Sequence, residues 1–68
     1  MEFKLNTEFI ELDNMLKAME LVVSGSEAKQ KILEGLVKVN GVVELRVRRK
    51  LRPGDYVEFS GEKIEVVA

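Results

Sequence analysis

The chain has 68 residues, with 11 lysines and arginines against 12 acidic residues, and it contains neither histidine nor cysteine. A chain of this length is expected to form one small domain over residues 1–68. The absence of histidine and cysteine from the sequence argues against an enzyme, a metal site or a bound cofactor. No signal-like segment opens the chain and no apolar run approaches the roughly 20 residues that span a bilayer, which predicts a soluble, cytoplasmic protein without a membrane partner.

The first predicted helix begins at about Glu11. Before it, two alternatives stay open for Glu2 to Leu5, a short edge strand or an ordered tail. The apolar residues then recur at i, i+4, i+7 and i+11, which indicates one buried stripe on a helix: Leu12, Leu16, Met19 and Val23.

A second helix is predicted from Gly25 to about Glu34. Ser24 followed three residues later by Glu27 is a capping box, with Ser24 as the N-cap. Gly35 suits the left-handed position after a helix end. The buried side is marked by Ala28, Ile32 and Leu36. Almost nothing separates the two helices, which favours a tight helix-turn-helix-like pair.

The period changes to two after Gly35, which indicates strands. Asn40-Gly41 between valines predicts a type I′ hairpin turn, and Arg52 to Asp55, with Pro53 and Gly54 in the centre, predicts a type II turn. Two further strands are predicted, joined at Ser60-Gly61: Tyr56 to Phe59 and Lys63 to Val67. The predicted class is α+β, two packed helices followed by a small curled antiparallel sheet.

Positive charge is concentrated in one part of the sequence. Residues Ala28 to Arg52 carry eight cations and two acids, and the segment RVRRKLR, Arg46 to Arg52, has five cations in seven residues. If this segment is extended, alternate side chains share a face. Arg46, Arg48 and Lys50 then form an outward row of about 13 Å that suits successive phosphates, while Val47, Arg49 and Leu51 face the other way. A solvated, salt-bridged strand is the alternative.

Aromatic residues are few. Phe9 and Phe59 are predicted to lie in the core. Tyr56, near the cations, is a candidate contact for a base or sugar, although a half-buried strand tyrosine is equally consistent with its position. Contacts to nucleic acid are therefore expected mainly with phosphates and through shape.

The order of these elements resembles the ribosomal protein S-four-like RNA-binding domain, the αL motif, and in particular its short bacterial stand-alone members. The resemblance covers about residues 9–67. It is carried by Leu12-Asp13 with Leu16, by Ser24-Gly25-Ser26-Glu27-Ala28-Lys29, by Ile32 and Gly35, by Val37-Lys38-Val39-Asn40-Gly41, and by Pro53-Gly54-Asp55 with Val57.

The resemblance implies binding to structured RNA, typically ribosomal RNA, and so a partner that could be the ribosome. Many family members have arginine where this chain has Gly25, which leaves the start of the second helix sterically open to a phosphate. The predicted RNA-binding residues are Gly25, Ser26, Lys29, Lys31, Lys38, Arg46, Arg48, Arg49, Lys50, Arg52 and Tyr56. The alternative function is a protein–protein interaction module that uses separate acidic and basic faces.

Overall fold

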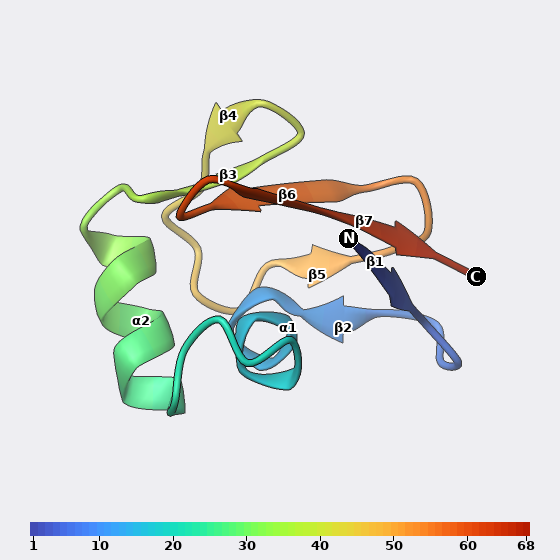
Figure 1. Ribbon diagram of the computed structural model, residues 1–68, viewed down its shortest axis with the longest axis horizontal. Helices are drawn as coiled ribbons and strands as arrows, with labels where there is room; N and C mark the ends of the chain where they lie inside the picture. Colours follow the sequence, from blue (N-terminus) through green and yellow to red (C-terminus); the bar gives the residue numbers. More distant parts are fainter.

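The computed structural model describes residues 1–68 and contains two helices and seven short strands (Figure 1). The helices are α1 (Leu12–Ala18) and α2 (Gly25–Leu33). The strands are β1 (Glu2–Lys4), β2 (Ile10–Glu11), β3 (Val37–Val39), β4 (Val42–Val43), β5 (Lys50–Leu51), β6 (Tyr56–Phe59) and β7 (Glu62–Val67). Neither helix has the length and apolar character that crossing a bilayer requires.

Five of the strands form one sheet in the order β1-β7-β6-β3-β4, and β2 pairs with β5 separately. All pairs are antiparallel except β1 with β7, which is parallel, so the sheet is mixed and the prediction of an antiparallel sheet is wrong at this edge. The α+β class is confirmed, but the predicted order of helices before sheet is wrong because two strands precede α1. Of the two alternatives for the first residues, the edge strand is the one observed.

The first strand is held by partners at the other end of the chain. The Leu5 N–H donates to the Val67 carbonyl at 2.7 Å, and the amino group of Met1 donates to the Lys63 carbonyl at 2.9 Å. Such pairing over more than sixty residues leaves no local signature, since three residues without a turn signal are compatible with a strand or a tail.

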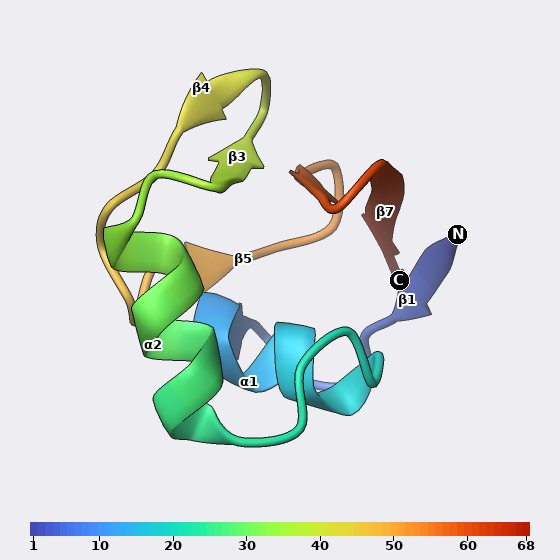
Figure 2. The same cartoon turned by 60° about the vertical axis from the view of Figure 1, so that its left-hand side comes forward.

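The core lies between the helices and one face of the five-stranded sheet (Figure 2). Its 14 buried residues are all apolar. Both helices contribute, and alternate residues of β3, β6 and β7 point inward: Leu12, Met15, Leu16, Ala28, Ile32, Val37, Val39, Val57, Phe59, Ile64 and Val66. This period of two leaves the other face of the sheet to polar side chains.

The first helix ends earlier than predicted. Glu20 takes a left-handed φ of 58°, its N–H donates to the Lys17 carbonyl, and the Leu21 N–H donates to the Leu16 carbonyl. These two bonds form a Schellman motif, which terminates a helix. The linker is therefore Met19 to Ser24, and Val23, predicted to be buried, is 91% exposed. Glutamate is an unusual residue at this position, so the sequence carries no stop signal here.

The second helix begins and ends where predicted. The Glu27 N–H donates to the Ser24 hydroxyl at 3.1 Å, which confirms the N-cap, although the Glu27 carboxylate accepts from the Val23 N–H and not from that of Ser24. Gly35 has a φ of 77°. Leu36 lies beyond the helix end and is 52% exposed, so its predicted burial is wrong.

The predicted turns are confirmed by left-handed backbone angles. Asn40 and Gly41 have φ values of 54° and 84°, as a type I′ turn requires, and Gly54 has a φ of 101°. The Ser60-Gly61 turn joins β6 to β7. Along the chain, the Asn40-Gly41 hairpin precedes the basic segment and the Pro53-Gly54 turn follows it.

Candidate functional site

The basic segment Arg46 to Arg52 is not extended along its whole length. A turn lies at Val47-Arg48, with the Arg49 N–H donating to the Arg46 carbonyl at 3.2 Å, and only Lys50 and Leu51 form a strand. The predicted straight row of Arg46, Arg48 and Lys50 is therefore wrong. The segment curves, and its side chains surround a space instead of lining a strand face.

The start of α1 holds the curved segment in place. Its first N–H groups have no intrahelical partner, and Glu11 provides no side-chain cap. The N–H of Leu12 donates to the Arg49 carbonyl at 2.8 Å and that of Asp13 to the Val47 carbonyl at 3.1 Å. Val47 packs against the core and Leu51 is fully buried, as predicted. The backbone between these two apolar anchors is thus fixed while the charged side chains project outward.

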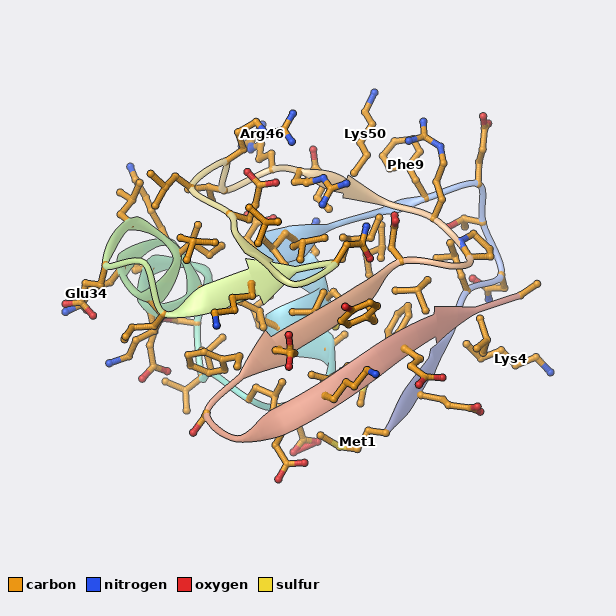
Figure 3. The ribbon with its side chains drawn as sticks, turned by 90° about the horizontal axis from the view of Figure 1, so that it is seen from above. Met1, Lys4, Phe9, Glu34, Arg46 and Lys50 are labelled. Carbon is orange, nitrogen blue, oxygen red and sulfur yellow. The ribbon has the colours of Figure 1, made fainter.

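Together the cations line a hollow of about 580 Å³, here called the basic hollow. Its lining is formed by five side chains, none of them apolar: Arg46, Arg48, Arg49, Lys50 and Arg52. Arg46, Lys50 and Phe9 lie along one edge of the molecule in Figure 3, with Lys50 next to Phe9, and all three are far from Lys4 and Met1. The structure therefore brings together all five cations of the segment, although not in the predicted geometry.

Glu44 organises two of these cations. One of its carboxylate oxygens accepts from the Arg46 backbone N–H and Nε, the other accepts from the Arg46 terminal nitrogen, each at 3.0 Å. The second oxygen also lies 3.4 Å from Nε of Arg49. The side chain of Glu44 is 11% exposed and that of Arg46 is 75% exposed. The Arg46 hydrogen bonds outweigh the effect of burial and lower the pKa of the Glu44 carboxyl.

The remaining three cations of the basic hollow have no carboxylate partner. The only ion pairs in the structure are those of Glu44 with Arg46 and Arg49. Arg48, Lys50 and Arg52 are exposed. Their charges are therefore available to an anion, and guanidinium groups suit phosphate oxygens because they can donate two parallel hydrogen bonds.

Phe9 lies beside the basic hollow and not in the core. Its ring has Lys50 Nζ at 4.8 Å from the centroid and the Arg52 guanidinium carbon at 5.8 Å. It is partly buried, yet it is absent from the side chains that pack against the core. The prediction that Phe9 is a core residue is thus wrong, whereas Phe59, 8% exposed, is confirmed as one.

The predicted lysines outside RVRRKLR do not line the basic hollow. Lys38 lies on the outer face of the sheet, opposite Glu58, and Lys31 lines a separate hollow with Leu36, Phe59 and Ser60. Lys29, Gly25 and Ser26 are exposed on α2, whose first turn lies at the end remote from the sheet (Figure 1). A Cβ added to Gly25 would meet no atom within 4 Å, so this helix start is open.

Tyr56 occupies the outer face of the sheet. It is partly buried, lies opposite Glu65, and has Lys63 Nζ at 4.5 Å from its ring centroid. It does not line the basic hollow. The outer face mixes both charges, since Glu58 lies opposite both Lys38 and Lys63.

Two residues of the site were missed by the sequence interpretation. Glu44 stands two residues before Arg46, a spacing that could have indicated a local pair. Phe9 could not be separated from core phenylalanines by its pattern, because an apolar ring covered by cations has the same sequence signature as a buried ring.

No group of three acidic side chains is placed to hold a metal ion.

Comparisons with known proteins agree with this architecture. The family model of the S4 domain matches residues 3–67. The chain is 46% identical over 59 residues to the "Putative RNA-binding protein YbcJ" of Escherichia coli strain K12, covering 87% of this chain and 84% of that protein. The same values hold for the "Uncharacterized protein YbcJ" of Shigella flexneri.

A solved structure is also similar. The solution structure of YbcJ from Escherichia coli, described as revealing an αL motif involved in RNA-binding, superposes with a TM-score of 0.75 at 43% identity, over 98% of this chain and 86% of that one. The resemblance inferred from the sequence is thereby confirmed. The family match over nearly all residues, the identity to YbcJ and the shared fold show that this chain belongs to the S4 domain family.

Proposed function

We propose that this protein binds structured RNA, with the basic hollow as the principal contact to the phosphate backbone. The observation that carries the proposal is the convergence of five cations on one hollow without an apolar lining. Three of them have no carboxylate partner, and the exposed Arg46 guanidinium is oriented by Glu44. The RNA-binding description attached to YbcJ supports the same function.

Recognition through backbone and shape follows from the kind of side chains present. Arginine and lysine contacts to phosphates position a protein on RNA without reading its sequence. The curvature of the segment suits a place where the RNA backbone bends, because phosphates that converge can be met by cations that converge. Ribosomal RNA, rich in such bends, is the proposed target class.

The start of α2 is proposed as a second, weaker contact. Gly25, Ser26 and Lys29 are exposed, and no side chain obstructs the approach of a phosphate to Gly25. Lys31, Lys38 and Tyr56 line other depressions of the surface and not the basic hollow, so they are not assigned to the principal contact.

Ultraviolet cross-linking of the purified chain to a folded ribosomal RNA fragment, followed by mass spectrometry, tests the proposal. Cross-linked peptides should cover residues 46–52. Failure to retain the RNA, or cross-links confined to the outer face of the sheet, would contradict it. Cross-linking in cells, followed by sequencing of the bound RNA, tests whether ribosomal RNA is the target. If the sequenced RNA is not enriched in ribosomal RNA, that proposed target is excluded.

The alternative is a protein–protein interaction module. The same hollow would then hold an acidic segment of a partner protein. Because the outer sheet face mixes acids and lysines, the structure gives little support to a separate acidic face. Retention of RNA by the purified chain, with every other protein absent, separates the two functions.

A further inference from the structure

We propose that Phe9 is a platform on which one unpaired RNA base stacks, next to phosphates held in the basic hollow. This inference rests on the proposed function. It narrows the ligand from structured RNA in general to RNA that presents a base outside the helix, as a bulge or a loop does.

The surroundings of Phe9 are unusual for an apolar ring. The side chain is partly buried, but it does not pack against the core as Phe3 and Ile10 do. What lies over the ring is charged: Lys50 Nζ at 4.8 Å and the Arg52 guanidinium at 5.8 Å. Packing against the core therefore does not account for a phenylalanine in this place.

The β2–β5 ladder explains why the ring and the cations share a face. Ile10 lies opposite Leu51 in the ladder, and both pack inward, with Leu51 fully buried. Because side chains alternate along a strand, Phe9, Lys50 and Arg52 project away from the core. Figure 3 shows Phe9 and Lys50 side by side at the edge of the molecule. The ring is thus presented together with cations that line the basic hollow.

The two cations are suited to an exchange of partners. In the free protein they are attracted to the negative face of the ring. Phosphates are stronger partners for ammonium and guanidinium groups, and drawing the two side chains toward phosphates would uncover the ring. An adjacent base could then take their place, because every base has a flat π-face that stacks on an aromatic side chain.

Stacking on Phe9 selects for RNA structure and not for sequence. A base inside a duplex already has both faces covered by its neighbours, whereas an unpaired base has a face free for the ring. Because all four bases can stack, the expected preference concerns whether the nucleotide is unpaired and not which base it carries.

One RNA hairpin in three forms tests this inference by filter binding at a single salt concentration. The first form has one unpaired nucleotide, the second has an abasic nucleotide in the same position, and the third is fully paired. The first should bind at least about five-fold more tightly than the second, which has the same backbone charge but no base to stack. Phe9→Leu should abolish this difference, and Phe9→Tyr should keep it.

Phe3→Leu is the matched control, because Phe3 is a partly buried ring that packs on the core and does not line the basic hollow. It should keep the preference for the base. Equal binding of the intact and abasic forms, or an unchanged preference in Phe9→Leu, would overturn the inference and leave RNA binding intact. Absence of binding to all three forms would contradict the proposed function itself. The comparison of the intact and abasic RNA forms uses the wild-type protein, so it tests base stacking even if the Phe9→Leu variant does not fold.

Discussion

Both carboxylate oxygens of Glu44 accept hydrogen bonds from the guanidinium of Arg46, and one of them also accepts a hydrogen bond from the Arg46 backbone N–H. All three hydrogen bonds are 3.0 Å long. This relationship places a largely buried acid next to two of the cations that line the basic hollow. It reduces repulsion between neighbouring cations and fixes the direction of Arg46. Most of the Arg46 side chain stays exposed, so it can still meet an anion.

The Glu44 pair predicts a dependence of stability on pH. Hydrogen bonds from Arg46 lower the pKa of Glu44 in the folded protein. The stabilisation is thus fully present above the unfolded pKa of about 4.3 and is lost as the pH falls through the lower folded value. Urea unfolding of the wild type and Glu44→Gln should show a difference in unfolding free energy at pH 7 that shrinks at pH 3.

The control for this experiment is the same comparison in an Arg46→Gln background. Without the Arg46 side chain, the dependence of the Glu44→Gln effect on pH should be weaker. A difference between the wild type and Glu44→Gln that stays constant from pH 7 to pH 3 would show that the pair does not contribute in this way.

The N-cap of α2 predicts that loss of the Ser24 hydroxyl lowers the stability of the protein. Ser24→Ala removes the hydroxyl that accepts the Glu27 N–H, and should lower the unfolding free energy by about 1 kcal/mol. For a domain of this size the melting temperature should fall by about 4–8 °C. Ser26→Ala, at the second residue of α2 and without such a bond, should melt close to the wild type. Equal melting of both variants would argue against the cap.

The hairpin at Asn40-Gly41 predicts a strong effect of a β-branched residue. Gly41 has a φ of 84°, and a Cβ there would lie 3.4 Å from the Tyr56 hydroxyl. Gly41→Val should therefore destabilise the fold by well over 1 kcal/mol in chemical denaturation. Gly25→Ala is the matched control, since it meets no atom within 4 Å and should be neutral or stabilising. A Gly41→Val variant as stable as the wild type is the outcome that this turn does not allow.

Asp55 links the hairpin turn to the end of the basic segment. Its carboxylate accepts from the Asn40 side-chain amide and from the Arg52 N–H, both at 2.9 Å. Burial tends to raise the pKa of Asp55, but these two hydrogen bonds and the charges of Arg49 and Arg52 together lower it. Asp55→Ala should cost about 1–3 kcal/mol of unfolding free energy. In a double-mutant cycle with Asn40→Ala the two losses should not add, and full additivity would show that the link is energetically silent.

The local features of the fold were predictable from the sequence. The Ser24 cap, Gly35, the Asn40-Gly41 turn and the Pro53-Gly54 turn each depend on residues within a few positions, and all were placed correctly. The end of α1 was not, because a glutamate takes the left-handed position that glycine usually takes.

The geometry of the site depended on distant partners and was predicted only in part. The cations of RVRRKLR do come together, and Val47 and Leu51 do pack inward. The bend at Val47-Arg48 is imposed by N–H groups of Leu12 and Asp13, more than thirty residues away. The alternation of charged and apolar residues fits a straight strand as well as it fits the curved segment, so the sequence pattern alone could not predict the curvature.

The dependence of RNA affinity on salt tests the basic hollow most directly. If about five phosphates are bound, log affinity should fall with log salt concentration at a slope of roughly −3.5 to −4.5. The double variant Arg48→Gln and Lys50→Gln removes two cations of the hollow, and the control Lys4→Gln and Lys17→Gln removes two that do not line it. Filter binding of one structured RNA at several salt concentrations, with thermal melts alongside, should give a slope shallower by about 1.4 to 1.8 for the first variant and no change for the control. An unchanged slope for Arg48→Gln with Lys50→Gln in a folded protein would contradict the account.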